Sequence, residues 1–223
     1  MFLILKGKKV NVNYIWAYFI IFFVLWSIRE LWLIEYLDLM APLSKAITSA
    51  FVKITIWVIP VILLVQLIEK RNPVSYLGLR HNFSKGLKWA GWFSLALVTY
   101  LVVLYLVILN KPFNINTGFN EWLNTIILVG IIEEIVFRGF LLRKFMEKFK
   151  FWKANTITSL LFLSIHFPIW FYKGLFELPY ILSSMITAFV LGIIFGFIYK
   201  KTDSLWSVIV IHSLYNLLIS IFN

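Results

Sequence analysis

The stretch of sequence that decides the fold covers residues 178–199, LPYILSSMITAFVLGIIFGFIY, and it contains no charged residue. A helix needs about 20 consecutive apolar residues to cross the hydrocarbon core of a bilayer. Working outward from this stretch, we find six more runs of comparable length and character, at residues 12–28, 46–67, 87–109, 122–142, 154–172 and 204–222. The sequence therefore predicts an all-α, polytopic membrane helix bundle of about seven transmembrane helices.

The composition excludes the other broad classes of protein. Of the 223 residues, 61% are apolar and 14% are charged, whereas a soluble domain is about half apolar and about a quarter charged. The 22 Phe, 10 Trp and 10 Tyr residues are too many for the interior of a small globule. The absence of cysteine excludes a disulfide-stapled secreted scaffold. We therefore expect a single integral membrane domain over residues 1–223, with no soluble domain attached.

The net charge of +11 is distributed unevenly over the loops. Only Arg29, Lys45, Lys111 and Lys173 fall in loops on one predicted side of the membrane. The basic residues of the other side are Lys6, Lys8, Lys9, Lys70, Arg71, Arg80, Lys85, Lys88, Arg143, Lys144, Lys148, Lys150, Lys153, Lys200 and Lys201. Because cytoplasmic loops carry the excess of Lys and Arg, we predict a cytoplasmic N-terminus and an external C-terminus. The basic charge then reflects contact with the lipid bilayer, and nucleic acid is not expected as a partner.

Ionisable residues deep inside three of the predicted spans are the candidates for function. The fourth span contains Glu133, Glu134 and Arg138, the fifth contains His166, and the seventh contains His212. Each such residue costs roughly 2.5–3.5 kcal/mol on insertion scales and usually faces a polar interior. At about 1.5 Å of rise per residue, Glu133, His166 and His212 all fall near the middle of the membrane, so we predict one shared site. Lys53, in contrast, is expected to extend its ammonium group outward to the membrane surface.

Helical spacing predicts which of these side chains face each other. Glu134 and Arg138 lie four residues apart and should pair within their helix, while Glu133 points about 100° away toward a different partner. His212 and Asn216 share one face of the seventh span by the same spacing. Pro168 follows His166 closely and is expected to interrupt the fifth span there.

Two kinds of hydrolytic chemistry fit these groups. A carboxylate and an imidazole can deprotonate a shared water, and a second imidazole with an amide can hold the oxyanion, without any cofactor. Alternatively, Glu133, His166 and His212 are the ligand set of a catalytic zinc with an open position, although the H-E-x-x-H helix is absent. A non-catalytic peptide-binding membrane protein and a proton-coupled transporter are further alternatives, and a transporter more often shows paired repeats.

Three ordered motifs carry a specific resemblance. Residues 133–138 fit E-E-x-x-x-R, residues 162–166 fit F-x-x-x-H, and residues 212–216 fit H-x-x-x-N. In this order, on three hydrophobic spans, they resemble the CPBP family, the CAAX proteases and bacteriocin-processing enzymes also called the Abi family. Residues 76–80, YLGLR, are similar to an element found upstream in bacterial members.

The resemblance implies an intramembrane endopeptidase and a role for each matched residue. Glu133 would be the principal base, and His166 would help to activate water. His212 and Asn216 would stabilise the oxyanion, and Glu134 with Arg138 would support the site. The catalytic core would then lie in residues 122–222, preceded by N-terminal spans in residues 1–121.

The resemblance leaves the substrate open within one broad class. Eukaryotic members trim prenylated CAAX proteins, whereas bacterial members are associated with bacteriocin immunity, peptide maturation and membrane-protein processing. We therefore expect a peptide or membrane-protein substrate. The composition, rich in Lys, Asn, Ile and Phe, suggests a multi-pass protein of a bacterial cell membrane.

Overall fold

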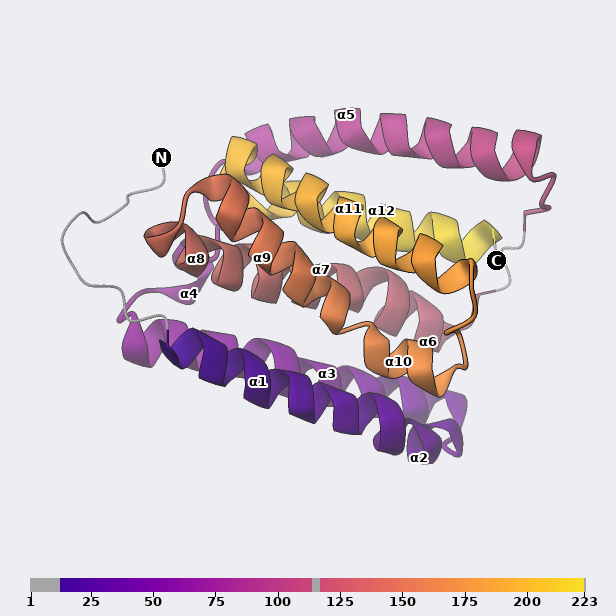
Figure 1. The fold of residues 1–223 in the computed structure, drawn as a ribbon, viewed down its shortest axis with the longest axis horizontal. Coiled ribbons are helices and arrows are strands. Elements are labelled where there is room, and N and C mark those ends of the chain that lie inside the picture. The colour runs from indigo at the N-terminus through magenta and orange to yellow at the C-terminus, as the bar shows by residue number, and fades with distance from the viewer. Residues whose placement is uncertain (1–12, 114–116, 223) are drawn as a thin grey trace.

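The computed structural model describes residues 13–113 and 117–222, and all regular structure in these ranges is helical (Figure 1). The helical elements are α1 (Asn13–Ile28), η1 (Arg29–Leu33), α2 (Ile34–Asp38), α3 (Pro42–Leu63), η2 (Leu64–Ile68), α4 (Pro73–Tyr76), α5 (Phe83–Val102), η3 (Val103–Ile108), α6 (Phe119–Glu121), η4 (Trp122–Ile127), α7 (Leu128–Glu134), η5 (Ile135–Leu142), α8 (Arg143–Lys148), α9 (Phe151–Ser164), α10 (Phe167–Tyr172), α11 (Tyr180–Thr202) and α12 (Leu205–Phe222). The segments labelled η have π-helical hydrogen bonding and continue the neighbouring α-helices. The predicted all-α fold class is confirmed.

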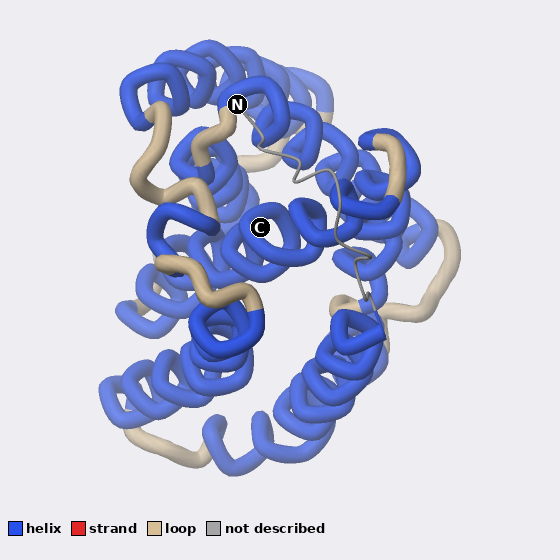
Figure 2. The backbone as a smooth tube through the Cα atoms, turned by 90° about the vertical axis from the view of Figure 1, so that its left-hand side faces the viewer, coloured by secondary structure: helices blue, strands red, loops and turns tan. Residues whose placement is uncertain are grey.

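The long helices run side by side along one axis and form a bundle, which Figure 2 shows end-on. Within residues 13–113 and 117–222, six helical stretches are long and apolar enough to cross a membrane: Asn13–Asp38, Pro42–Ile68, Phe83–Ile108, Phe151–Tyr172, Tyr180–Thr202 and Leu205–Phe222. They correspond to six of the seven predicted spans. The protein is therefore a multi-pass membrane protein.

The fourth predicted span lies in a continuous helix over residues 119–148, which we call the central helix. It runs through α6, η4, α7, η5 and α8 and differs from the six apolar stretches in carrying Glu133, Glu134 and Arg138. Every residue of η5 is buried. The central helix can hold charges at depth because protein, instead of lipid, surrounds them. Together with the six apolar stretches it makes the seven helices that the sequence predicts.

The two ends of the bundle differ in charge as the loop analysis predicts. α1 begins and α12 ends at opposite ends of the bundle, as an odd number of crossings requires (Figure 1). The turn containing α4, the junction of α8 with α9 and the turn between α11 and α12 all lie at the end where α1 begins. These connections carry the basic residues of the predicted cytoplasmic side, from Lys70 to Lys201. Lys6, Lys8, Lys9 and the start of the first predicted span at Val12 lie outside the described residues.

The first span is longer than the sequence predicts. The apolar run ends at Ile28, but the helix continues through η1 and α2 to Asp38. Arg29, which the loop analysis places outside the membrane, is buried with its Nη1 2.6 Å from Glu30 Oε1. Its guanidinium carbon also lies 5.3 Å from the centre of the Trp26 ring. The ion pair and the aromatic ring offset the cost of burying this charge, which hydrophobicity alone does not register.

The expectation for Lys53 is wrong. Its side chain is only 6% exposed, and its Nζ donates a hydrogen bond to the backbone carbonyl of Asn124 at 2.6 Å. Asn124 in turn donates through Nδ2 to the carbonyl of Ala46 on α3 at 2.8 Å. The lysine points into the bundle because the neighbouring helix offers an acceptor there, so no extension to the membrane surface is needed.

The predicted interruption at Pro168 is confirmed. α9 ends at Ser164, and α10 begins at Phe167 with Pro168 in its first turn. A break in a membrane helix leaves backbone carbonyls that need donors from neighbouring protein. Trp26 of α1 supplies one, because its Nε1 donates to the carbonyl of Ile165 at 3.1 Å. This break places His166 between two short helices instead of inside one.

A chain of buried aromatic rings connects the N-terminal helices to the central helix. The Trp57 ring of α3 meets Phe22 and Trp26 of α1 edge-on, with ring centres 4.7 and 4.9 Å apart. Phe137 of the central helix follows at 6.1 Å from Trp57, and Phe162 of α9 lies 5.2 Å beyond Phe137. Edge-to-face aromatic pairs of this kind stabilise a specific packing beyond their buried area. They hold the C-terminal end of α9, where Phe162 lies, against the part of the central helix that carries Glu133, Glu134 and Arg138.

Candidate active site

The central helix forms the ion pair that its spacing predicts. Arg138 Nη1 donates to Glu134 Oε1 at 2.8 Å, and the two side chains are 1% and 0% exposed. A fully buried pair is stable only when further contacts satisfy its remaining groups.

Arg138 has such contacts. Its guanidinium carbon lies 4.5 Å from the ring centre of Phe162 and 5.4 Å from that of Phe195. Its Nη2 donates to the backbone carbonyl of Gly192 on α11 at 3.3 Å. The guanidinium group therefore lies against aromatic rings from α9 and α11, an arrangement that favours a buried cation.

His212 of α12 contacts both glutamates of the central helix. Its Nδ1 is 2.8 Å from Glu134 Oε1, and its Nε2 is 3.7 Å from Glu133 Oε2. All three side chains are buried. Glu134 thus bridges Arg138 and His212, whereas Glu133 faces the second imidazole nitrogen, as the angle between the two glutamates on the helix predicts.

The geometry of His166 defines which of its nitrogens carries a proton. Its Nδ1 is 2.9 Å from the backbone carbonyl of Phe162, one turn earlier. A carbonyl oxygen only accepts hydrogen bonds, so Nδ1 is the donor, and in the neutral ring Nε2 keeps its lone pair. The ring packs between Phe162 and Trp170, with ring centres 5.1 and 5.4 Å away.

Asn216 lies one turn after His212 on α12. Its Nδ2 donates to the backbone carbonyl of Thr125 in η4 at 2.9 Å. This bond fixes the amide against the central helix while one face of the side chain remains partly exposed.

These side chains meet at one cavity of about 380 Å³, which we call the site cavity. Glu133, His166, His212 and Asn216 all line it, and Glu134 and Arg138 lie directly behind them. The structure therefore brings together the residues that the sequence places at similar depth, from three separate spans. Their roles in a shared catalytic site stay a prediction.

Sequence reasoning missed the hydroxyl groups of this cavity. Its lining also includes Tyr105, Ser183, Ser184, Thr187 and Tyr215. Uncharged hydroxyls are common in membrane helices, so a search for ionisable residues passes over them. The spacing of Ser183 and Thr187, four residues apart on α11, is the signal that could have indicated a polar face.

A close approach between two helices positions the site. A Cβ atom added to Gly130 would lie 2.3 Å from Ser213 Oγ and 3.0 Å from the Ser213 backbone nitrogen. Only glycine allows the central helix and α12 to come so near. Ser213 follows His212, and Glu133 lies one turn from Gly130. This contact therefore sets the separation of the Glu133 carboxylate and the His212 imidazole.

A catalytic zinc ion needs three protein ligands that converge on one point. Among the residues that the structure describes, no three His, Cys, Asp or Glu side chains are arranged to hold a metal. Glu134 Oε1 takes His212 Nδ1, and the Phe162 carbonyl takes His166 Nδ1.

The protein is thus a multi-pass membrane protein whose helical bundle encloses a polar cavity with carboxylate and imidazole groups. Residues 114–218 match the family model described as type II CAAX prenyl endopeptidase Rce1-like. This segment contains all six of the candidate residues, and the match confirms the resemblance to the CPBP family of CAAX proteases. It indicates a hydrolase of the CAAX-protease type. Neither the curated proteins nor the solved structures gave a match.

Proposed function

We propose that the protein is an intramembrane endopeptidase in which Glu133 and His166 activate water to hydrolyse a peptide bond. One observation carries the proposal: a buried carboxylate and two imidazoles from three spans line the same cavity. The Rce1-like segment supports peptide hydrolysis as the reaction.

The first step is deprotonation of water. The Glu133 carboxylate and the Nε2 lone pair of His166 both accept hydrogen bonds and line the site cavity. A water held by these two acceptors loses a proton as its oxygen attacks the peptide carbonyl carbon, which is general-base catalysis.

The second requirement is a place for the negative charge that develops on the carbonyl oxygen. The Glu134 carboxylate accepts a hydrogen bond from Nδ1 of His212 and orients the ring, and in our proposal Nε2 of this ring also carries a proton. That proton and the amide of Asn216 are the donors that we assign to the oxyanion. Collapse of the tetrahedral intermediate breaks the carbon–nitrogen bond, and the proton taken from water moves to the leaving amine.

Glu134 and Arg138 have a positioning role in this proposal. Neither lines the site cavity, and their pair is enclosed by Phe162 and Phe195. Arg138 holds the Glu134 carboxylate in place through their ion pair, and Glu134 in turn orients the imidazole of His212.

We further propose a membrane-associated protein or peptide as substrate, because the site cavity lies among helices that cross the bilayer. Within that class we place the protein in a bacterial cell membrane, in a pathway of peptide maturation such as bacteriocin processing or immunity. The catalytic core is assigned to residues 122–222, which include every residue of the mechanism.

The test is mass spectrometry of membrane peptides from cells that express the wild type or Glu133→Gln. The glutamine keeps the shape of the side chain and removes the base, so cleavage products should fall by about 10²- to 10⁴-fold. Glu121→Gln is the matched control, because it makes the same change at the start of the same helix, outside the lining of the site cavity. If Glu133→Gln produces the same peptides as the wild type at equal protein levels, the protein binds peptides without cleaving them and the enzyme proposal fails.

A further inference from the structure

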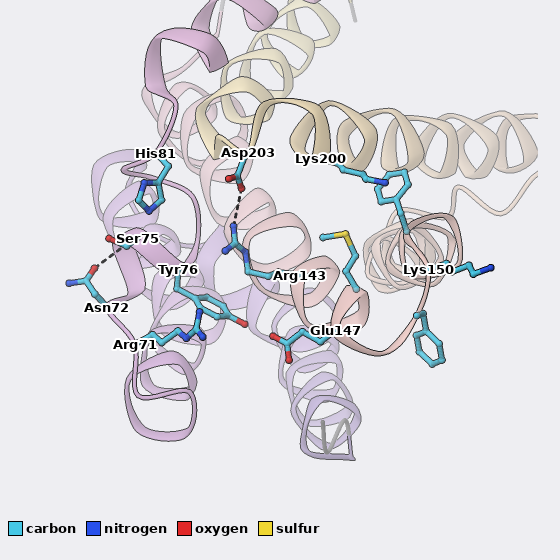
Figure 3. Close-up of a pocket in the computed structure, with 13 residues that line it drawn as sticks. Arg71, Asn72, Ser75, Tyr76, His81, Arg143, Glu147, Lys150, Lys200 and Asp203 are labelled. Atoms are coloured by element: carbon cyan, nitrogen blue, oxygen red, sulfur yellow. Dashed lines mark hydrogen bonds and ion pairs between the residues drawn. The ribbon is translucent and has the colours of Figure 1, made fainter. Parts of the chain in front are cut away.

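A second cavity, of about 410 Å³, lies at the end of the bundle where α4 and α8 are found (Figure 3). We call it the basic cavity. Three segments far apart in the sequence form its walls: the turn containing α4, the junction of α8 with α9, and the turn between α11 and α12. Its polar lining consists of Arg71, Asn72, Ser75, Tyr76, His81, Arg143, Glu147, Lys150, Lys200 and Asp203.

The cavity has more cations than its acids can balance. Asp203 Oδ1 lies 3.3 Å from Arg143 Nη2, and Glu147 Oε2 lies 2.6 Å from Nζ of Lys144, outside the cavity. Both acids are thus engaged. Arg71 and Lys200 have no carboxylate partner among the residues that the structure describes. Lys150 also lines the cavity without a carboxylate partner among these residues, so Arg71, Lys150 and Lys200 together carry its surplus charge.

One aromatic ring holds two guanidinium groups near each other. The guanidinium carbons of Arg71 and Arg143 lie 6.0 and 5.4 Å from the centre of the Tyr76 ring. Burial raises the pKa of the Tyr76 hydroxyl, so this group stays neutral and offsets neither charge. Asp203 pairs with Arg143, so the unbalanced charge beside this ring is that of Arg71, which attracts an anion.

The YLGLR element, residues 76–80, connects the walls of the basic cavity. It has no role in the proposed catalytic mechanism. The Tyr199 hydroxyl donates to the Leu77 carbonyl at 3.3 Å, and Trp206 Nε1 donates to the Leu79 carbonyl at 2.9 Å. Between them, the Leu205 backbone nitrogen donates to the Gly78 carbonyl at 3.0 Å. Gly78 has a φ of +82°, where other residues are strained. The element therefore ties the α4 turn to the α11–α12 turn and keeps the cavity open between them.

An apolar groove of about 450 Å³ lies between α1 and the helix formed by α3 and η2. Its lining ends with Leu64, Leu67 and Ile68, just before Arg71 of the basic cavity. Only the hydroxyls of Tyr14 and Tyr18 are polar among its lining side chains. Because Ile68 and Arg71 are three residues apart, these parts of the two linings lie within about 11 Å of each other. A phospholipid needs a cationic site for its headgroup and an apolar surface near it.

We propose that the basic cavity binds the phosphate of an anionic phospholipid in the leaflet at this end of the bundle, with an acyl chain in the apolar groove. Guanidinium groups match the geometry of phosphate oxygens, and Arg71 supplies one that no described carboxylate balances. Basic pockets at the cytoplasmic ends of membrane helices bind anionic headgroups. A free phosphate shares the chemistry of the headgroup, and the groove is what favours the lipid.

The test compares two double variants of the full-length protein in detergent by native mass spectrometry. Arg71→Gln/Lys200→Gln removes two of the three surplus cations of the basic cavity. Arg80→Gln/Lys201→Gln removes two exposed cations from the same two turns that do not line it. Each protein is titrated with phosphatidylglycerol, phosphatidylcholine and inorganic phosphate.

We expect the wild type to prefer phosphatidylglycerol and the cavity variant to bind it roughly thirtyfold more weakly, at about fivefold for each cation. The control variant should stay within about twofold of the wild type, since its net charge changes equally without touching the site. Equal losses in both variants would reduce the binding to general surface charge and overturn the proposal. It would also be overturned by a wild type that does not distinguish the two lipids, or by inorganic phosphate that displaces phosphatidylglycerol at equal concentration.

Discussion

The carboxylate of Glu134 holds the imidazole of His212, with Oε1 of the glutamate 2.8 Å from Nδ1 of the histidine. The same oxygen lies 2.8 Å from Arg138 Nη1. The sequence predicts that Glu134 pairs with Arg138. The structure adds that Glu134 also contacts His212, which lines the site cavity. The two glutamates of the E-E-x-x-x-R motif therefore have different roles: Glu133 lines the site cavity, and Glu134 holds Arg138 and His212. Mutation can distinguish these roles.

Replacing Glu134 should cost stability as well as activity. Glu134→Gln leaves the Arg138 guanidinium buried without its charge partner, so we expect the free energy of unfolding to fall by about 3–5 kcal/mol. Thermal unfolding of the purified protein in detergent measures this. Glu133→Gln keeps the Glu134–Arg138 pair and should unfold within a few degrees of the wild type while losing turnover. Equal stability of the two variants would contradict the different roles assigned to Glu133 and Glu134.

The close approach at Gly130 should control activity from outside the site cavity. Gly130→Ala puts a methyl group against the backbone of Ser213 and pushes α12 away from the central helix. A displacement of about 1 Å of the reacting groups can cost on the order of 10²-fold in rate. Gly91→Ala, on α5, is the control, because an added Cβ there meets nothing within 4 Å. Turnover of the two variants, measured at equal protein levels, should differ by that factor.

The charge distribution predicts the orientation of the bundle. A reporter fused after Asn223 should be active only outside the cytoplasm, and a reporter inserted near His81 only inside. Paired reporters that work on opposite sides of the membrane, such as alkaline phosphatase and a fluorescent protein, measure both positions. If the two insertions report the same side, the number of crossings between them is even and the topology is wrong.

Removal of metal ions tests the type of catalysis. A mechanism that uses only Glu133, His166, His212 and Asn216 predicts full activity after exhaustive chelation. It also predicts that His212→Ala lowers kcat more than it raises KM, because this histidine acts on the transition state. Stoichiometric zinc in elemental analysis, with activity lost on chelation and restored by zinc, would instead make Glu133, His166 and His212 ligands. Glu134 would then be the remaining base.

Much of the architecture follows from local properties of the chain. A backbone in lipid must satisfy its own hydrogen bonds, so apolar runs of sufficient length become helices regardless of their neighbours. The cost of burying charge then makes Glu133, His166 and His212 conspicuous without any structure. The pairing of Glu134 with Arg138 and the break at Pro168 are also local, since each depends on residues within one or two turns.

The sequence by itself thus determined a helical membrane bundle, the depth of its ionisable groups and the residues that share a helix face. Only the tertiary structure decided what those groups touch. Lys53 turns inward to the Asn124 carbonyl, Arg29 stays buried beside Glu30, and His212 meets Glu134 across two helices. The contacts of Lys53 and His212 each join two helices that lie far apart in the sequence. They depend on how closely those helices pack, which steric details such as Gly130 against Ser213 set and no pattern along a single helix contains.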